Sequence, residues 1–188
     1  MTHELRDLKV AILAADGVER VELEQPRGAL YGAGATTEIL SIHPGEIQAR
    51  QWDLNAAGTF SVDRLVSDAS PEEYDALLLP GGTMNPDQLR MNEDAVGFVK
   101  AFVATGKPVA TICHGPWTLA EADVVRGRRL TSWPSIRTDL RNAGAEVVDE
   151  EVVIDGQFIS SRSPADLPAF CAAVVERFAQ AKAPVSGG

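Results

Sequence analysis

The sequence is poor in the residues that build disulfide frameworks and metal centres. Among its 188 residues there are only two cysteines and three histidines. Cys113 and Cys171 stand far apart, no CxxC pair occurs, and the histidines offer no zinc-binding spacing. A phosphate-binding glycine loop is also missing, because Gly32 and Gly34 fall at the end of a predicted helix rather than at its start. We therefore expect no metal, no nucleotide and no other cofactor.

Basic residues and long apolar runs are scarce as well. The 17 Lys and Arg residues are outnumbered by 27 Asp and Glu residues, which gives a net charge of −10. So acidic a surface repels phosphate backbones and anionic lipids, which argues against nucleic-acid and membrane partners. No apolar run approaches the roughly 20 residues that cross a bilayer. The polar N-terminus does not resemble a signal peptide, so we predict a cytoplasmic protein.

The composition is that of one globular domain, with 45% hydrophobic and 23% charged residues. We expect it to span residues 1–188, with an ordered core at about 8–181 and a frayed tail at 184–188. Strands are predicted at residues 8–15, 35–42, 75–80, 108–113, 130–133, 146–154 and 157–161. Helices are predicted at 19–33, 92–105, 116–125, 135–142 and 164–181. Residues 44–70 are predicted to be irregular, with short β-like pieces around 48–52 and 59–62.

This alternation of strands and helices predicts an α/β fold, in which a mostly parallel sheet lies between two layers of helices. In such sheets the functional site lies outside the carboxyl ends of the strands. Unusual residues follow three predicted strands, at positions 16–19, 81–82 and 113–115. We expect the functional centre where these segments meet, around Cys113 and His114.

Cys113 stands where an apolar strand runs directly into a turn and then a helix. A nucleophile on such an elbow is presented by a sharp, strained backbone. Gly115 allows close backbone approach, and Pro116 suits a first helical position. Free N–H groups at the helix start favour the thiolate, so we expect a lowered pKa for Cys113. The alternative is an inert, buried cysteine at the end of a strand.

The neighbouring residues supply candidates for a base and an oxyanion site. His114 is the best available base for the thiol, since His3 and His43 are predicted to lie in solvated surface segments. No histidine follows position 114, which excludes a papain-like protease and a triad glutaminase. Gly81 and Gly82 either donate N–H groups to an oxyanion beside the sulfur or form a simple turn.

Two acids are candidate partners for this pair, and each has an ordinary structural alternative. Asp87 follows the glycine pair and either orients the base or caps a helix. Glu19 follows the first strand and either faces Cys113 or is a favourable acid in a first helical turn. Cys171 lies on an apolar helical face with Leu167 and Val174, which indicates a core position.

Taken together, these segments resemble the PfpI family of intracellular peptidase-like and deglycase-like proteins, within the superfamily that includes the Parkinson-associated deglycase. The resemblance runs from about residue 8 to 180. It rests on six segments: DGVERVEL at 16–23, DALLLPGG at 75–82, PDQLR at 86–90, KPVATICHGP at 107–116, RRLTSWPSI at 128–136 and GQFISSRSPAD at 156–166.

The resemblance implies a three-layer, flavodoxin-like α/β/α sandwich with a cysteine nucleophile elbow. It further implies Cys113 as nucleophile, His114 as its base and Glu19 as the carboxyl group touching the sulfur. Trp133 stands where a tyrosine often lines the site. Asp87 occupies the loop whose acid can complete the site of a neighbouring subunit. We therefore predict a homo-oligomer, with a dimer favoured.

Three functions fit these residues. The first is a thiol hydrolase or lyase that acts on small reactive carbonyls, their adducts or peptides, with Gly82 and His114 N–H groups holding the oxyanion. The second is a non-enzymatic redox sensor in which Cys113 is oxidised. The third is a chaperone-like binding module with a vestigial site. The lack of an obvious insertion that would build a peptide cleft favours small substrates.

Overall fold

The computed structural model describes residues 4–182, so His3 and the predicted tail at 184–188 lie outside the described residues. A seven-stranded sheet forms the centre, in the order β11-β12-β8-β7-β1-β3-β6. Its strands are β1 (Lys9–Leu13), β3 (Thr36–Ser41), β6 (Arg64–Leu65), β7 (Ala76–Leu79), β8 (Val109–Ile112), β11 (Val152–Asp155) and β12 (Phe158–Ser161). Every neighbouring pair is parallel except β11 and β12.

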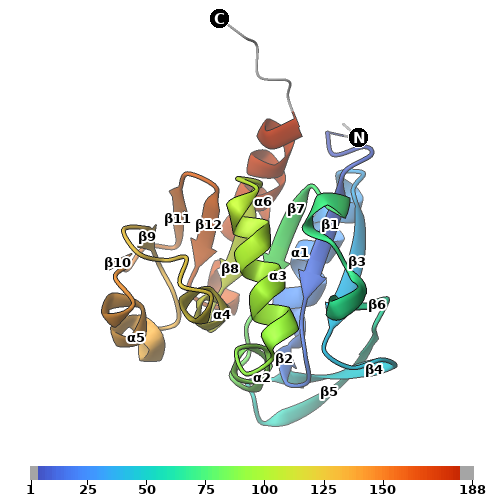
Figure 1. Cartoon of the computed structure of the whole chain (residues 1–188), viewed down its shortest axis with the longest axis horizontal. Helices are drawn as coiled ribbons and strands as arrows, with labels where there is room; N and C mark the ends of the chain where they lie inside the picture. Colours follow the sequence, from blue (N-terminus) through green and yellow to red (C-terminus); the bar gives the residue numbers. More distant parts are fainter. Residues whose placement is uncertain (1–3, 183–188) are drawn as a thin grey trace, which may run out of the picture.

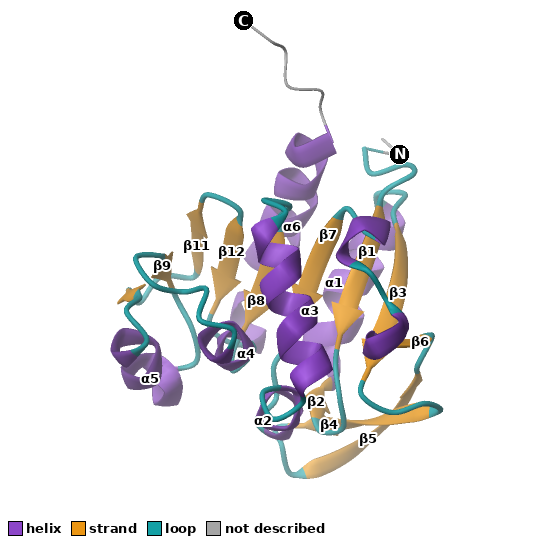
Figure 2. Cartoon of the chain, in the orientation of Figure 1, coloured by secondary structure: helices purple, strands orange, loops and turns teal. Residues whose placement is uncertain are grey.

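Helices cover both faces of this sheet (Figures 1 and 2). On one face, α1 (Arg20–Gly32) packs beside α6 (Leu167–Lys182). On the other lie α3 (Glu93–Ala104) and α4 (Pro116–Glu121), with α2 (Met84–Leu89) and α5 (Arg137–Asn142) nearby. Strands β7 and β8 are buried at every position, because a strand covered on both faces has no solvated side. The predicted three-layer sandwich is confirmed.

Each layer of helices encloses its own apolar core. Between the sheet and the α1/α6 layer, Leu23, Phe170 and Phe178 pack against β1 and β8 residues. On the opposite face, Phe98 and Phe102 of α3 pack against the other side chains of the same strands. The alternation of side chains along each strand therefore supplies both cores at once.

Residues 44–70 are more regular than predicted. They form an antiparallel hairpin of β4 (Glu46–Gln51) and β5 (Asn55–Ser61), and β4 pairs in turn with the short β2 (Val18–Glu19). The hairpin was not predicted because its turn at residues 52–54 lacks the usual Asn-Gly or Asp-Gly dipeptide. Its tip reaches the carboxyl end of the central sheet, at the bottom of Figure 1.

Two further elements differ from the prediction. Helix α2 was not expected, since it contains Pro86, but a proline in the first turn loses no internal hydrogen bond. The predicted strand 146–154 is divided by the acidic residues 149–151. Its first part, β10 (Glu146–Val147), pairs with β9 (Arg129–Leu130) in a separate small sheet. Four short 3-10 turns occur in the described part of the chain: Val66–Asp68, Pro71–Glu73, Pro134–Ile136 and Pro164–Asp166.

Within residues 4–182, the structure contains no helix that combines the length and apolar character needed to span a bilayer.

Candidate active site

Cys113 occupies a sharp elbow between β8 and α4. Its φ is 62°, a left-handed conformation that a residue other than glycine adopts only under constraint. The constraint includes two backbone hydrogen bonds, from Cys113 N to Ser161 O (3.1 Å) and from Gly115 N to Ile112 O (2.9 Å). The predicted strained elbow is therefore present, at the carboxyl edge of a central strand.

Gly115 is required here by space rather than by its backbone angles. A β-carbon at this position would lie 2.5 Å from both the Leu79 carbonyl oxygen and Thr111 Oγ1. Its φ of −49° suits any residue. The elbow can therefore pass close to β7 only because position 115 has no side chain.

His114 lies directly against the sulfur. Its Nδ1 is 3.2 Å from Cys113 Sγ, and its Nε2 is 3.3 Å from Ser135 Oγ. The ring stacks on Trp133, with centroids 5.9 Å apart and planes 25° apart. Burial lowers the pKa of His114, so the ring is neutral at pH 7 and Nδ1 can accept a proton.

The backbone N–H groups around the sulfur are not equivalent. Those of Gly82 and His114 donate to Cys113 and favour its charged form. The N–H of Gly81 donates instead to Glu22 Oε2 at 2.9 Å, and that of Gly115 is used within the elbow. Of the three candidate glycines, only Gly82 therefore directs its N–H at the sulfur.

The carboxyl group beside the sulfur belongs to Glu22 and not to Glu19, which corrects the expected contact. Glu22 is fully buried in the first turn of α1. A β-carbon at Gly81 would touch both Glu22 Oε2 (2.3 Å) and Cys113 Cβ (2.7 Å), so the two side chains pack over the same glycine. The other carboxyl oxygen of Glu22, Oε1, is buried without a hydrogen-bond partner among the described residues.

Glu19 lines the same pocket from a different direction. Its Oε2 accepts a long hydrogen bond (3.4 Å) from the N–H of Asp53. Glu22 follows Glu19 by three residues, one helical turn later on the same face. Two acids at that spacing were the signal that the sequence offered for a carboxyl group near the sulfur. Choosing the one that contacts the sulfur required knowing the residue at which α1 begins.

Burial also corrects the expected pKa of Cys113. Loss of water around the thiol raises its pKa, a charged Glu22 raises it further, and the two N–H groups oppose both effects only in part. Burial likewise raises the pKa of Glu22 to about 8. Two acids in contact inside a dry pocket do not both ionise readily, so at neutral pH Glu22 holds its proton.

Asp87 does not reach this site within one chain. It is exposed on α2, where it borders a surface hollow with Arg90 and Met91. It is not a helix cap either, since α2 begins at Met84 and Thr83 occupies the capping position. His43, by contrast, pairs with Asp16 (Nε2 to Oδ2, 2.9 Å) and takes no part in the Cys113 cluster.

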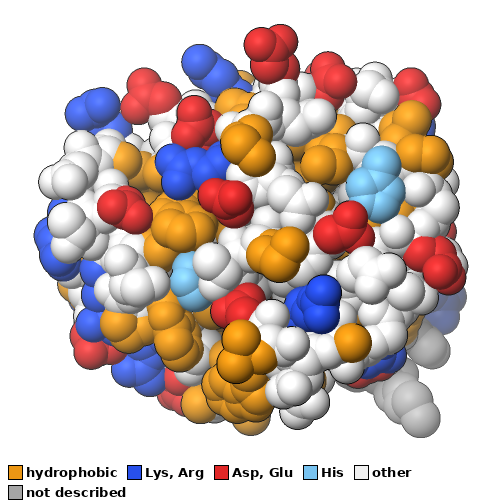
Figure 3. Space-filling model, turned by 90° about the horizontal axis from the view of Figure 1, so that it is seen from below, with side chains coloured by type: hydrophobic (Ala, Val, Ile, Leu, Met, Phe, Trp, Pro, Cys, Tyr) orange, Lys and Arg blue, Asp and Glu red, His pale blue; other side chains and the backbone are white. Residues whose placement is uncertain are grey.

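A pocket of about 160 Å³ opens onto Cys113. Beyond the predicted residues it is lined by Glu22, by Trp52 and Asp53 of the hairpin tip, and by Pro164. Neither the tip nor Pro164 was predicted, because they come from parts of the chain that only the tertiary fold brings together. Figure 3 views the molecule from this end, where apolar and acidic side chains lie side by side.

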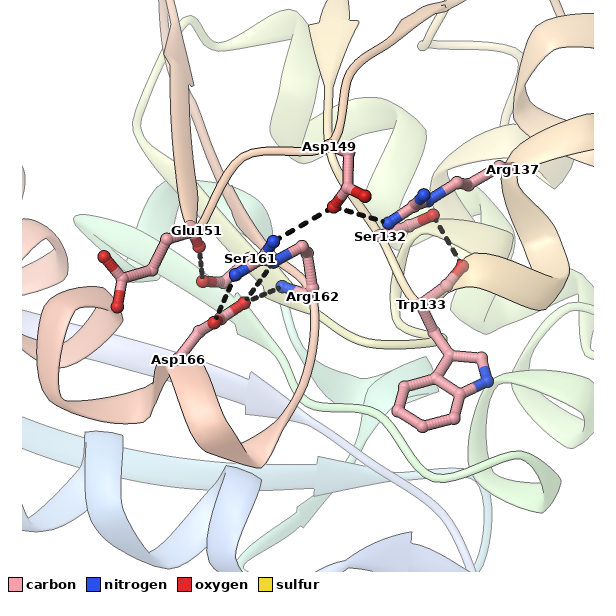
Figure 4. A network of polar contacts seen from close by, with 8 residues as sticks. All are labelled: Ser132, Trp133, Arg137, Asp149, Glu151, Ser161, Arg162 and Asp166. Atoms are coloured by element: carbon pink, nitrogen blue, oxygen red, sulfur yellow. Dashed lines mark hydrogen bonds and ion pairs between the residues drawn. The ribbon is translucent and has the colours of Figure 1, made fainter.

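Trp133 and Pro164 form one wall of the pocket, and a polar network joins the segments that carry them. Figure 4 shows this network together with Trp133. Asp149 Oδ1 accepts from Arg137 Nη2 (2.8 Å) and from Arg162 Nη1 (3.0 Å). Arg162 also pairs with Asp166 through two hydrogen bonds of 2.9 Å. Arg137 lies shortly after Trp133 in the sequence, and Arg162 lies shortly before Pro164. Asp149 binds both arginines and so connects the two segments that carry the wall.

No group of three His, Cys, Asp or Glu side chains within residues 4–182 has an arrangement suited to a metal ion. The functional groups at the sulfur are the Cys113 thiol, the neutral imidazole of His114, the N–H groups of Gly82 and His114, and the protonated carboxyl group of Glu22. This set is suited to thiol addition at an electrophilic carbon.

Comparison with known proteins gives consistent matches to one family. Residues 8–177 match the sequence profile of the DJ-1/PfpI family. A deglycase of Thermococcus kodakarensis is 44% identical over 163 residues, covering 87% of this chain and 95% of the relative. The protein/nucleic acid deglycase 2 of Escherichia coli is 46% identical over 165 residues, covering 86% and 92%.

A solved structure has the same architecture. It is a two-domain protein of Anabaena variabilis that contains DJ-1/ThiJ/PfpI-like and ferritin-like domains. It superposes with a TM-score of 0.84 at 37% identity, and it covers 91% of this chain. The present chain spans about half of that protein, 48% of its length.

The close packing at Gly115 predicts a large effect of one methyl group. Gly115→Ala forces a β-carbon against two oxygen atoms and is expected to cost about 1–3 kcal/mol of unfolding free energy. The control is Gly97→Ala on the exposed side of α3, where a β-carbon meets nothing within 4 Å. This substitution is expected to raise the unfolding free energy by about 0.5–1 kcal/mol. Urea denaturation measures both, and equal effects would contradict the packing argument.

The raised pKa of Glu22 predicts a pH dependence of stability. The folded chain holds this proton more tightly than the unfolded chain, so the unfolding free energy falls as pH rises from about 4.5 to about 8. Glu22→Gln is expected to flatten that fall, which is at most about 1.4 kcal/mol per pH unit. Glu24→Gln, on the exposed side of α1, is the control and should leave the pH dependence of the unfolding free energy unchanged. An unaltered slope in Glu22→Gln would contradict the assignment.

Proposed function

Because this chain belongs to the DJ-1/PfpI family, we propose that it is a cysteine-dependent enzyme that acts on small reactive carbonyls or on their adducts with amines and thiols. The observation that carries the proposal is the contact of Cys113 Sγ with the neutral imidazole of His114, 3.2 Å away, at the floor of a small pocket. The two relatives named deglycases support this substrate class. The pocket volume of about 160 Å³ favours small substrates over extended peptides.

In the proposed reaction the sulfur of Cys113 adds to the carbonyl carbon while its proton passes to His114 Nδ1. The charge that develops on the carbonyl oxygen is held by the N–H groups of Gly82 and His114. Protonated Glu22 lies beside the reacting sulfur and can donate a hydrogen bond through its unpartnered oxygen. An adduct is cleaved in the reverse sense: its carbinol hydroxyl gives a proton to His114, the carbonyl group re-forms, and the amine or thiol leaves with that proton.

With methylglyoxal, this addition gives a thiohemiacetal at the aldehyde carbon. The hydrogen of that carbon then moves as a proton to the neighbouring ketone carbon, which yields the thioester of a 2-hydroxy acid. Water hydrolyses the thioester and frees the thiol. The net reaction adds one water molecule, and its internal oxidation and reduction cancel.

A redox sensor is the second candidate, and one observation favours it. The N–H groups of Gly82 and His114 and the carboxyl group of Glu22 form hydrogen bonds with Cys113, and the same donors could hold oxygen atoms added to the sulfur by oxidation. Such a sensor needs an accessible sulfur but no turnover. A chaperone-like module would need neither an accessible sulfur nor turnover. Neither carbonyl chemistry nor oxidation at Cys113 would then matter for its function.

We also propose that the active form is a homodimer or larger homo-oligomer. Among residues 4–182 of one chain, His114 Nε2 forms a hydrogen bond with Ser135 and none with a carboxylate. Asp87 faces solvent on α2 between the exposed methionines Met84 and Met91, an apolar setting suited to a second copy. Asp87 of a second copy would then orient His114 across the interface.

Turnover of methylglyoxal, and of a methylglyoxal-modified thiol, tests the nucleophile. We expect Cys113→Ser to lower kcat at least about 1,000-fold, because a neutral hydroxyl is a far weaker nucleophile. Cys171→Ser is the matched control and should retain activity, since Cys171 packs against the core. Full activity in Cys113→Ser would sink the enzyme proposal. No turnover in wild type would favour the redox sensor, with oxidation of Cys113 as the next measurement.

Mixing of inactive variants tests the role of Asp87. We expect Asp87→Ala to lower kcat about 10–100-fold, as is typical when an orienting acid is lost. Mixed dimers of Asp87→Ala and Cys113→Ser should regain activity, because one site then combines an intact Cys113 with the partner's intact acid. Asp94→Asn, exposed on α3, is the control. A fully active monomer in sedimentation, or no recovery on mixing, would rule out the contribution across subunits.

A further inference from the structure

The tip of the β4–β5 hairpin has a conformation that its residues do not favour. The register pairs Gln51 with Asn55, which leaves Trp52, Asp53 and Leu54 in the turn. Trp52 has a φ of 54° and Asp53 a φ of 59°, angles usually adopted by glycine or asparagine in hairpin turns. Such angles persist only where surrounding contacts hold them.

Asp53 supplies those contacts. Its Oδ1 accepts from the N–H of Thr83 (2.7 Å), and its Oδ2 accepts from Thr83 Oγ1 (2.8 Å). Its own N–H donates to Glu19. Thr83 directly follows Gly82, whose N–H faces the sulfur. One side chain therefore fastens the hairpin tip to the segment that carries the oxyanion donor.

The fastened tip closes one side of the Cys113 pocket. Trp52 lines the pocket although 61% of its surface faces solvent, so the ring forms an outer wall rather than part of a core. Trp133 lies on the opposite segment and stacks on His114. Release of the tip would widen the pocket without altering Cys113 or His114.

The electrostatic character of the pocket is one-sided. Carboxyl groups of Glu19, Glu22 and Asp53 line it, and among the described lining residues there is no Lys or Arg. Arg20 adjoins Glu19 in sequence but donates to Glu24 and to the Ala57 carbonyl instead. Because Glu22 is protonated, the charge that an anionic substrate would meet is that of the Asp53 carboxylate, in a partly dry space where charges interact strongly.

We propose that the hairpin tip makes the Cys113 pocket selective for small carbonyl compounds without a negative charge, with Asp53 as the specificity-determining residue. The selectivity by size comes from Trp52, which Asp53 holds in place through Thr83. The selectivity by charge comes from the Asp53 carboxylate itself. The choice of carbonyl compounds rests on the proposed function, whereas the exclusion of bulky and anionic molecules does not.

Alkylation of Cys113 tests the selectivity without requiring turnover. Iodoacetamide and iodoacetate differ in charge but little in size, and Cys171→Ser serves as the background so that only Cys113 reacts. We expect wild type to prefer the neutral reagent at least about tenfold more strongly than a free thiol does, a factor equivalent to about 1.4 kcal/mol. Asp53→Asn should remove most of that excess preference. A wild-type preference equal to that of a free thiol would overturn the proposal, even if the variant did not fold.

Two further variants separate charge from size. Thr83→Val keeps the charge of Asp53 but removes the hydroxyl group that donates to it, which loosens the hairpin tip. This variant should therefore react faster with the bulkier N-ethylmaleimide. Its discrimination against iodoacetate should stay the same as in wild type. Glu46→Gln removes an exposed charge at the base of the same hairpin and should change neither ratio. Equal loss of charge discrimination in Asp53→Asn and Glu46→Gln would overturn the role of Asp53.

Turnover gives the corresponding substrate profile. Methylglyoxal is small and neutral, 2,3-dioxopropanoate is a small 2-oxoaldehyde with a carboxylate, and phenylglyoxal is neutral and bulky. Asp53→Asn should raise kcat/KM for 2,3-dioxopropanoate relative to methylglyoxal about tenfold, and Thr83→Val should raise this ratio only for phenylglyoxal. If no carbonyl is turned over while alkylation follows the expected order, the proposed function fails and the selectivity stands. Unchanged ratios in both assays would refute the selectivity itself.

Discussion

The backbone at Cys113 turns through a left-handed conformation at the end of a central strand, and the arrangement of the site depends on that turn. It directs the sulfur out of the sheet and against the ring of the next residue, His114. Two neighbouring positions must then lack a side chain. Gly115 clears the β7 backbone, and Gly81 leaves room for Glu22 and Cys113 together. The strained backbone at Cys113 is therefore accompanied by glycine at positions 81 and 115, where a side chain would clash.

The dryness of the pocket determines how these groups share protons. Burial disfavours charge on Cys113, Glu22 and His114 alike, so each is neutral at pH 7 in the resting site. In the proposed reaction, the neutral thiol therefore transfers its proton to the neutral imidazole as the sulfur attacks. This differs from the preformed thiolate expected from the helix start alone. The short α4, with six residues, does not outweigh the loss of water around the sulfur.

The sequence was most informative where one local pattern determines the structure. The apolar runs ending at Leu79 and Ile112 predicted buried strands, and the segment Cys113 to Pro116 predicted the elbow, because the requirements of both are local. Glu22 could not be separated from Glu19, since a shift of one turn in the helix start exchanges their roles. The hairpin tip was missed because Trp52 and Asp53 adopt their angles through contacts with Thr83, far away in sequence.

The most direct test of the account is to observe the bond that it requires at Cys113. Wild-type protein would be mixed with excess methylglyoxal, quenched within a single turnover and examined by mass spectrometry of the intact chain and its peptides. The account predicts an adduct on the peptide that contains Cys113, which forms and decays at the rate of turnover, while the Cys171 peptide stays unmodified. Substrate consumption with an unmodified Cys113, or a stable adduct that never decays, would contradict it.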